Sequence, residues 1–586
     1  MVLLPVTAAI DAKNNIIINA GTSKLSVNSK GQYGINNTVA EENADKPFKI
    51  EVTADNLAIK AENTKDSVFG IHAQNNHGSQ AASAMVVVNG AANVNVKGGE
   101  QAVGVYASGN STVELNGNLV MKGPKGEWGV DNNGTSSMGY HSVNGILADA
   151  PYGAEHTGGK VVVNGNVDLA VNGTGVLANG NGSTVVINGG GSILTNNSNQ
   201  EANYALAAEN GSISMNMNHD NTAAGTNKVD IKGNIGVLNS LVGDFGEQNG
   251  SVINLGLSTA DSSLHGVAVN SFADAKQKAG SKAQLNMYLS NGALWTNEAY
   301  NKVNESFTGS KVDKLVGGSD ADHAGFILQK DAKPLTIGNY SGNTVIVYGH
   351  FNDGTSANDF IHGDTHIGSA AAGSGIILST NNDNINTKDE DQVNEVLNNL
   401  AGKLYYDAYK NGEKNLKGKV QIASGLTGSS VSKALAGGDM SFKDENGQGQ
   451  YTPSTTPPAP PVTPPSDKQV FDVQIMDSNT AGQELWDYWG SRNPYVQKGT
   501  NRKEVVTGQD IFGREFREIQ YNFSGDAVLN IDSNNDIICS NPTNSQFAAI
   551  ETATSKTVRM KLNDHSMDIN VKGELGGYNN TTYGIK

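Results

Sequence analysis

A glycine-marked unit recurs along the first half of the chain and limits the fold more than any other feature of the sequence. In each copy a glycine precedes a β-branched or aliphatic residue, and later marks fall at 145, 175, 205, 236 and 266, a period of about thirty. Periods of this length are typical of solenoids, in which each repeat stacks on the one before. The copies are Tyr33-Gly34-Ile35, Phe69-Gly70-Ile71, Val103-Gly104-Val105, Asn144-Gly145-Ile146, Thr174-Gly175-Val176, Tyr204-Ala205-Leu206 (with alanine for glycine), Ile235-Gly236-Val237 and His265-Gly266-Val267.

Two further segments rich in β-branched residues lie between successive marks, and most of them end in Asn-Gly or Lys-Gly. The clearest pairs are 85–90 and 94–98, 161–165 and 167–173, and 185–189 and 193–194. Asn-Gly turns also favour antiparallel hairpins, so a meander of hairpins is the alternative fold. Three strands in each unit argue against the meander. Strand direction alternates in a meander, so with an odd number of strands the same strand would point in opposite directions in successive units.

Three strands per unit predict an all-β fold, a parallel β-helix in which each rung stacks on the last at about 4.8 Å. We expect the marking glycine to lie at a tight corner. We also expect asparagines at the repeated turns to form a stacked amide ladder. Residues 344–349 and 374–378 continue the pattern, and 330–373 is interpreted as rungs with longer loops.

The composition suits such a solenoid better than a compact globular enzyme. Of 586 residues 70 are glycine and only 6% are aromatic, so few large side chains are available for one wide core. The net charge of −17 disfavours nucleic acid as a partner, because binding it requires a basic surface. The single cysteine, Cys539, excludes an internal disulfide, and its apolar neighbours predict a buried strand position. The sequence contains no run of eighteen apolar residues and so predicts no membrane-spanning helix.

The strand pattern breaks after residue 388. Apolar residues recur there at three- and four-residue spacing, which predicts an amphipathic helix over 389–410 that ends at Asn411-Gly412. We expect this helix to cover an apolar flank or end of the solenoid, with a partner-binding helix as the alternative. The spaced residues are Val393, Val396, Leu397, Leu400 and Leu404.

A proline-rich segment then separates two parts of the chain. Seven of the fourteen prolines lie within 453–465, and all five arginines follow them, which supports a linker and a domain boundary. The repeated unit returns after the linker, and Tyr583-Gly584-Ile585 matches the first mark close to the end of the chain. We therefore expect the start of a second β-helix, truncated, with further rungs missing.

These features predict six parts. Residues 1–10 look like the back half of a signal peptide that lacks its positive start, with an ordinary first strand as the alternative. The parts are 1–10, the possible signal remnant; 11–388, the parallel β-helix; 389–450, the helix with final strands and a cap; 451–467, the linker; 468–525, an aromatic-containing plug or cap; and 526–586, the second β-helix.

Residues 393–406, VNEVLNNLAGKLYY, and 418–427, GKVQIASGLT, together with the glycine- and asparagine-rich rungs over most of 11–385, resemble passenger domains of autotransporters of the type V secretion class. The resemblance implies a right-handed parallel β-helix, exported across the outer membrane of a Gram-negative bacterium and displayed at the cell surface. It also implies adhesion, autoaggregation or biofilm interaction, with host or bacterial surface glycans or proteins, or further copies of the chain, as partners. The sequence departs from the family because no C-terminal translocator barrel follows.

Three histidines and three aspartates between residues 350 and 366 suggest a metal site as one hypothesis. His362 and His366 have the spacing of helical ligands, but on a strand their imidazoles would lie about 13 Å apart. We therefore expect solvated loop histidines, and we expect no metal or other cofactor. The six residues are His350, Asp353, Asp359, His362, Asp364 and His366.

An aromatic cluster follows the linker. Trp486, Tyr488 and Trp489 are candidate ligand-contact residues, because aromatic faces beside carboxylates can stack on sugars. The alternative is a hydrophobic plug at the start of the second β-helix, with Phe512 and Phe516 nearby.

We expect no catalytic residues, with a β-helix polysaccharide lyase or hydrolase as the alternative function. Such enzymes need carboxylates, often with arginine or lysine, clustered on consecutive rungs. Residues 1–450 contain no arginine, and their carboxylates fall mostly in turns. Carboxylate pairs aligned across adjacent rungs would favour the enzyme.

Overall fold

The computed structural model divides into two units, Met1–Pro464 and Pro465–Lys586, which are described separately. In the second unit the structure describes only the strands given below. In the first unit it describes residues 8–453 except for 13–14, 40–47, 64, 76–82, 124, 133–141, 151–157, 198–201, 239–249, 272–282, 304–306, 350–361, 382–384, 386–388, 424–425, 428–429 and 432–433.

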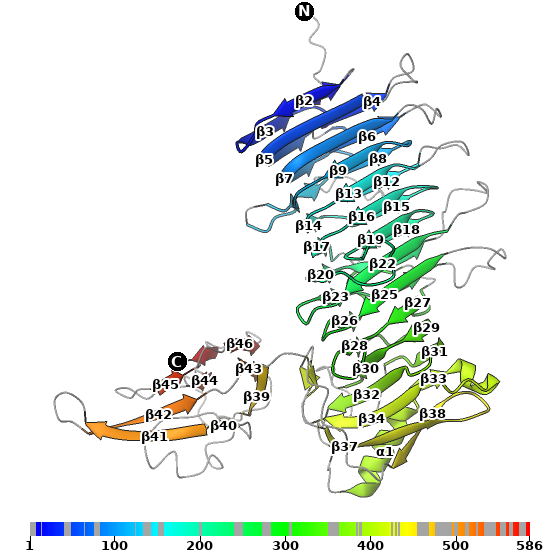
Figure 1. The fold of residues 1–586 in the computed structure, drawn as a ribbon, viewed down its shortest axis with the longest axis vertical. Helices are drawn as coiled ribbons and strands as arrows, with labels where there is room; N and C mark the ends of the chain where they lie inside the picture. Colours follow the sequence, from blue (N-terminus) through cyan, green and yellow to red (C-terminus); the bar gives the residue numbers. More distant parts are fainter. Residues whose placement is uncertain are drawn as a thin grey trace, which may run out of the picture. The chain divides into compact units, whose positions relative to one another are not determined.

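Nine strands of the first unit form one parallel ladder, and this ladder carries the glycine-marked unit (Figure 1). Each strand pairs with the next copy of the unit: Ile35 lies opposite Ile71, for example, and Ile146 opposite Val176. The parallel stacking is therefore confirmed, and the hairpin meander is wrong for these strands. In order of pairing they are β1 (Ala8–Ala12), β4 (Tyr33–Val39), β6 (Val68–Asn75), β8 (Ala102–Ser108), β12 (Val143–Asp149), β15 (Thr174–Asn179), β18 (Tyr204–Glu209), β21 (Asn234–Leu238) and β24 (Ala268–Asn270).

Two further parallel ladders lie in one large sheet, because the long strands β5 (Phe48–Glu62) and β7 (Ala84–Lys97) take part in both. The second ladder joins β2 (Ile16–Asn19), β5, β7, β9 (Thr112–Leu115), β13 (Lys160–Val163), β16 (Thr184–Ile187), β19 (Ser212–Met215), β22 (Val252–Leu257), β25 (Gln284–Leu289), β27 (Ser310–Val316), β29 (Leu335–Ser341), β31 (Thr365–Ala370) and β33 (Leu404–Tyr406). The third joins β3 (Lys24–Ser29), β5, β7, the pair β10 (Leu119–Met121) and β11 (Val130–Asp131), β14 (Val167–Val171), β17 (Gly191–Thr195), β20 (Val229–Lys232), β23 (Ser263–His265), β26 (Leu294–Asn297), β28 (Gly325–Gln329), β30 (Asn343–Val347), β32 (Gly375–Asn381) and β34 (Lys417–Ala423). The six strand segments predicted between the marks all fall within these ladders.

Except for Gly266, which lies between β23 and β24, the marking glycines lie inside the strands of the first ladder rather than in left-handed turns. A Cβ on Gly34 or Gly70 would lie 2.6 Å from the carbonyl oxygen of the next glycine in the ladder, and a Cβ on Gly104 would lie 2.7 Å from that of Gly145. None of these residues has a positive φ. The expected tight-corner role is therefore corrected: close approach between strands and core side chains excludes a side chain at these positions.

Strands β12 and β15 of the first ladder are apolar on both faces. Ile146 and Val176 belong to the main core, whereas Leu147 and Leu177, their neighbours in sequence, belong to a second buried cluster. Successive residues of a strand point to opposite faces, so the continuous apolar runs of β12 and β15 follow from burial on both sides. The main core continues through the whole first unit, from Val27 to Met440.

Antiparallel strands and one helix end the first unit. Strand β34 pairs antiparallel with β37 (Ala434–Phe442), and β37 pairs antiparallel with β38 (Gly449–Pro453). The short strands β35 (Leu426–Thr427) and β36 (Ser430–Val431) pair with each other. Helix α1 (Glu390–Ala401) contacts β34 and β38 and buries Val396, Leu397, Leu400 and Ala401 in the main core.

The predicted helix over 389–410 is too long. Asp389 caps α1, since its side chain accepts a hydrogen bond from Gln392 N, and Gly402 ends the helix. Leu404 then lies in β33, which pairs with β31, and residues Asp407–Asn411 form a separate 3₁₀ helix ended by Gly412. Pairing Leu404 and Tyr406 with the core ladder buries both side chains fully, which a continued helix would not do. No helix among the described residues is long and apolar enough to span a membrane.

Two predicted boundaries also differ. Residues 8–10 of the predicted signal remnant lie in β1, which pairs with β4 as the alternative interpretation expected; residues 1–7 lie outside the described part. Residues 451–453 of the predicted linker belong to β38, whose last residue is Pro453. Among the described strands β38 pairs only with β37, and proline is tolerated in such edge strands. The rest of the linker, 454–467, is not among the described residues.

The second unit contains the strands that the sequence predicts around 547–585. Parallel pairs join β39 (Lys468–Gln474) to β43 (Asp526–Asp532) and β43 to β46 (Met567–Lys572), β42 (Glu515–Asn522) to β45 (Val558–Lys561), and β44 (Phe547–Ile550) to β47 (Thr582–Ile585). Strands β40 (Tyr495–Val496) and β41 (Arg502–Gln509) pair antiparallel with β39 and β42. Strands β39 and β42, which lie in the predicted plug or cap, thus share sheets with the later strands.

Candidate functional site: a hollow beside a pinned loop

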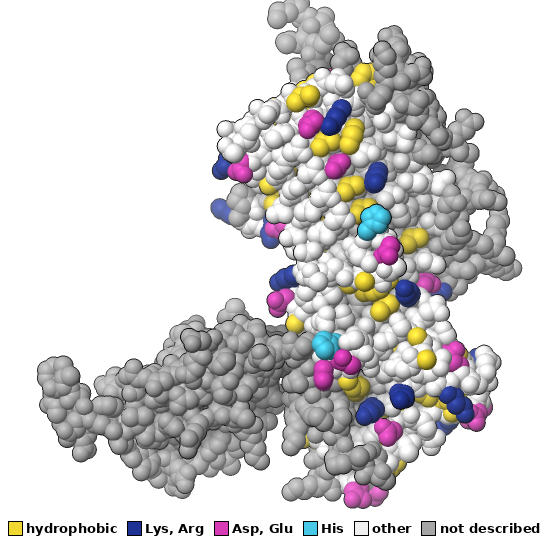
Figure 2. Space-filling view, in the orientation of Figure 1, with side chains coloured by type: hydrophobic (Ala, Val, Ile, Leu, Met, Phe, Trp, Pro, Cys, Tyr) yellow, Lys and Arg dark blue, Asp and Glu magenta, His cyan; other side chains and the backbone are white. Residues whose placement is uncertain are grey.

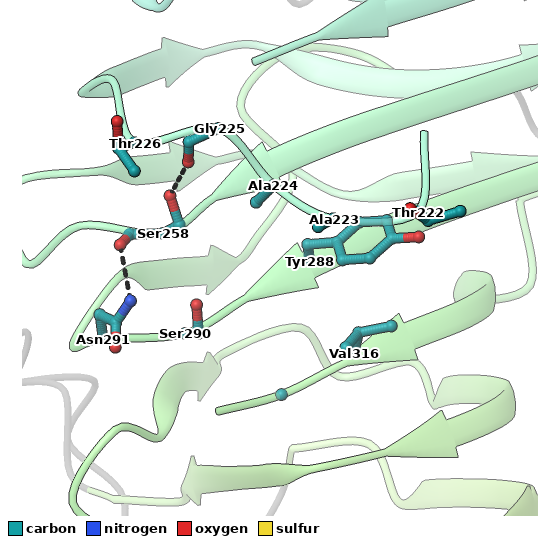
Figure 3. Close-up of a pocket in the computed structure, with 11 residues that line it drawn as sticks. Thr222, Ala223, Ala224, Gly225, Thr226, Ser258, Tyr288, Ser290, Asn291 and Val316 are labelled. Carbon is teal, nitrogen blue, oxygen red and sulfur yellow. Dashed lines mark hydrogen bonds between the residues drawn. The ribbon is translucent and has the colours of Figure 1, made fainter. Parts of the chain in front are cut away.

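Between β19 and β20 the chain leaves the stack, and this loop, residues 216–228, borders a surface hollow (Figure 3). The hollow encloses about 250 Å³. Its lining residues are Thr222, Ala223, Ala224, Gly225, Thr226, Ser258, Tyr288, Ser290, Asn291, Val316 and Gly317. The loop and the turns after three ladder strands therefore form it together.

Asn216 fixes the base of the loop. Its side chain is fully buried and donates from Nδ2 to the carbonyl oxygens of Asn227, at 2.9 Å, and Gly256, at 3.0 Å. Its φ of 52° is a left-handed conformation that asparagine tolerates better than most residues. The first bond joins the two ends of the loop to each other, and the second joins the loop to β22.

Tyr288 fixes the tip of the loop. The ring lies on β25 and is only 5% exposed, and its hydroxyl donates to the carbonyl oxygen of Asn221 at 2.9 Å. Lys314 Nζ donates in turn to this hydroxyl at 3.2 Å. Within the loop, Asn218 Oδ1 accepts from the backbone N–H groups of Thr222, at 2.8 Å, and Ala223, at 3.0 Å. The loop is thus held at base, tip and middle.

The floor of the hollow crosses consecutive strands of the second ladder. Ser258 follows β22, Ser290 and Asn291 follow β25, and Gly317 follows β27. Ser258 Oγ donates to the carbonyl oxygen of Gly225, and Asn291 Nδ2 donates to the carbonyl oxygen of Ser258 at 3.0 Å (Figure 3). Turns on neighbouring rungs are therefore bonded to one another and to the loop.

The hollow presents neutral polar groups. None of its eleven lining residues is charged. Among the described residues, the hydroxyls of Thr226 and Ser290 form no hydrogen bond, so both can donate to and accept from a ligand. Asp220, near the tip, is occupied: hydrogen bonds from Thr222 hold the pKa of its carboxyl below the usual value. The arrangement suits binding of a small neutral polar ligand rather than proton transfer.

An amide ladder follows the turns of the second ladder, as the sequence predicts. Asn116 donates to Asn89 at 2.9 Å, Asn164 to Asn116 at 2.7 Å, and Asn188 to Asn164 at 2.6 Å. Asn89 donates further to Glu51 Oε1 at 3.0 Å. Figure 2 shows that charged side chains are scattered over the described surface seen in that view, among much larger neutral areas.

The residues considered for a metal site do not converge, as far as the structure describes them. The expectation of solvated loop histidines is wrong for two of them, since His362 is only 5% exposed and His366 lies in β31. Both ring nitrogens of His362 face carbonyl oxygens, those of Lys330 at 3.1 Å and Gly349 at 3.2 Å, and Asp364 accepts from Lys403 at 3.0 Å. His366 stacks on Tyr405 with a centroid separation of 4.7 Å. No group of three His, Cys, Asp or Glu side chains in the described part could hold a metal ion.

The remaining predicted residues lie outside the described part of the chain: His350, Asp353, Asp359, Trp486, Tyr488, Trp489, Phe512 and Cys539; Phe516 lies in β42, whose side chains are not described. Sequence reasoning missed the hollow. Its only local signal is a polar interruption, NMNHDNTAAGTNK at 216–228, between two regular strand segments.

Two carboxylates of the third ladder accept hydrogen bonds from serine hydroxyls on neighbouring rungs. Asp168 accepts from Ser192 Oγ at 2.5 Å and Asp230 from Ser263 Oγ at 2.6 Å, in one series along the third ladder. In the registered pairs of the described strands, no carboxylate lies opposite another carboxylate. The arrangement that would favour a polysaccharide-active enzyme is not present in those pairs.

No protein-family model, curated protein or solved structure matches this chain. The structure itself defines the class: an all-β protein built from long parallel sheets. Its candidate site is a neutral hollow on a repetitive polar surface.

Proposed function

We propose that this chain is a non-catalytic adhesive solenoid of the bacterial surface. In this proposal it is a right-handed parallel β-helix with three strands per rung, exported as the passenger of an autotransporter. It functions in adhesion, autoaggregation or biofilm interaction, with surface glycans or proteins, or other copies of the chain, as partners.

The observation that carries the proposal is the repeated exposure of neutral hydrogen-bonding groups along a rigid stack. The amide ladder places asparagine side chains on successive rungs from Asn89 to Asn188. Each amide in such a ladder keeps hydrogen-bonding capacity for a partner. A long surface of this kind supports many weak contacts acting together, which is how multivalent adhesion gains strength.

Three parallel ladders support the three-strand rung. Between β12 and β18 the chain passes through the first, second and third ladders in turn, as β12, β13, β14 and then β15, β16, β17. The same order from one rung to the next is what a β-helix requires. An experimental structure that showed a left-handed path of the chain would contradict the proposed handedness.

Adhesion is tested by displaying the full chain, through a heterologous anchor, on cells that do not clump or bind surfaces. Cells with the chain should sediment faster or bind immobilised glycans, matrix proteins or other cells. A control variant, Gly70→Val with Gly145→Val, should reach the surface but lose these properties, because a side chain at either glycine collides with the next rung. Absence of clumping and of all binding by the wild-type cells would refute adhesion, and release of reducing ends from polysaccharides would refute a non-catalytic role.

A further inference from the structure

We propose that the hollow beside the 216–228 loop binds one neutral sugar ring, a hexopyranose of a surface glycan. The inference rests on the proposed adhesive function and assigns that function a specific contact. It follows from the size, polar groups, apolar contacts and rigidity of the hollow.

The size of the hollow suits a single ring. Its volume of about 250 Å³ lies below the range of about 300–1,000 Å³ that is typical of pockets for drug-sized molecules. Its floor crosses the turns after β22, β25 and β27, a distance of about 10 Å at the usual strand spacing. One pyranose ring fits this length, and the rest of a glycan chain would extend into solvent.

The polar groups match those of a sugar. The hydroxyls of Thr226 and Ser290 form no hydrogen bond with a described residue. They lie on different sides of the hollow, Thr226 on the loop and Ser290 on the floor. A hydroxyl both donates and accepts, as each sugar hydroxyl does, so the two sides can exchange hydrogen bonds in either direction. Asn291 adds an amide oxygen that accepts no hydrogen bond from a described residue.

The apolar groups are small and lie between these polar ones. Ala223, Val316 and the edge of the Tyr288 ring supply them. Tyr288 is almost completely buried, so only part of one edge of its ring can contact a ligand, and the ring face is not open for stacking. Such a surface suits the limited C–H face of a single sugar ring.

Charge and rigidity favour a neutral ligand. The ammonium group of Lys314 is already engaged, because it donates to the Tyr288 hydroxyl and lies 5.3 Å from the centroid of that ring. The loop is already fixed by Asn216 and Tyr288. Binding therefore requires little ordering of the protein, which limits its entropic cost.

The test uses the purified full chain and the methyl glycosides of glucose, galactose and mannose, with glucuronic acid for comparison. Saturation-transfer NMR and titration should detect binding of at least one neutral glycoside. Thr226→Val and Ser290→Ala should each weaken it about two- to tenfold, because each removes one hydrogen bond to the ligand. Ala223→Trp should abolish it by filling the hollow from its exposed side.

Thr336→Val is the matched control. Thr336 lies on β29, is partly exposed and forms no side-chain hydrogen bond with a described residue, so this variant should bind as the wild type does. Thermal unfolding must agree among all variants. Equal binding by the wild type and Ala223→Trp, or a salt-sensitive preference for glucuronic acid, would overturn the assignment.

The two proposals fail separately. If displayed cells adhere but the purified chain binds none of the neutral glycosides, the sugar site is refuted and the adhesive function stands. If a glycoside binds in the hollow but displayed cells do not adhere, the adhesive function is refuted and the site stands.

Discussion

His72 should make the first unit less stable below neutral pH. The ring is 2% exposed on β6 and lies among the rings of Tyr33, Phe69 and Tyr106, with centroid separations of 4.7 to 5.0 Å. Its Nδ1 lies 2.7 Å from Asn36 Oδ1, while Asn36 Nδ2 donates to Asp11. Since the amide oxygen therefore faces the ring, Nδ1 is the protonated nitrogen of a neutral imidazole.

Burial lowers the pKa of His72 to about 3, from 6.5 for an exposed histidine. Below pH 6.5 the unfolded chain takes up a proton that the folded ring does not, so stability falls as the pH falls, down to about pH 3. At pH 5, which is 1.5 units below the unfolded value, the loss is about 2 kcal/mol at about 1.36 kcal/mol per unit. A local opening that exposes His72 should then be about 30-fold more frequent.

Hydrogen exchange measured by mass spectrometry on peptides from β4, β6 and β8 tests this value, since opening of a solenoid is local. After correction for the intrinsic exchange rate, exchange at pH 5 should be about 30-fold faster than at pH 7.5. His72→Phe keeps an aromatic ring in the cluster and should remove this pH dependence. Unchanged protection in the wild type, or the same pH dependence in His72→Phe, would refute the reasoning.

Three further outcomes test the packing described above. Asn164→Ala removes two ladder hydrogen bonds and should cost about 1–2 kcal/mol of local stability. Asn188→Ala removes one of these bonds and should cost about half as much. Equal losses of stability for the two variants, measured by hydrogen exchange, would argue against the ladder. Gly145→Ala should cost roughly 1–3 kcal/mol, because its Cβ would lie 2.6 Å from the Gly175 carbonyl oxygen; thermal unfolding at the wild-type temperature would contradict the close approach. Tyr288→Phe should speed exchange at 218–226 but leave β22 and β25 protected, and protection equal to the wild type would show that the hydroxyl does not hold the loop.

The ladders could be predicted because their information is local and repeated. Each strand carries its own β-branched residues and turn, and stacking requires only that the next copy do the same. The amide ladder follows for the same reason, since the asparagine before each turn glycine recurs with the strand. The parallel direction of the strands followed from the odd number of strands per unit.

The features that the sequence did not predict depend on contacts between distant residues. The glycine positions depend on the backbone of the next rung, 30 to 41 residues away, and not on local turn geometry. Leu404 has helical spacing from Leu400, but pairing with β31 places it in a strand. The hollow requires Asn216 and Tyr288 to bond with partners 40 and 67 residues away.

The amide ladder joins asparagines that are 24, 27 or 48 residues apart in sequence, yet its hydrogen bonds range only from 2.6 to 2.9 Å. The number of residues between rungs and the distance between rungs are therefore independent. Insertions and deletions between rungs can thus change the loops of this chain without altering the register of its core. Peptides grafted into these loops should consequently have little effect on whether the chain folds.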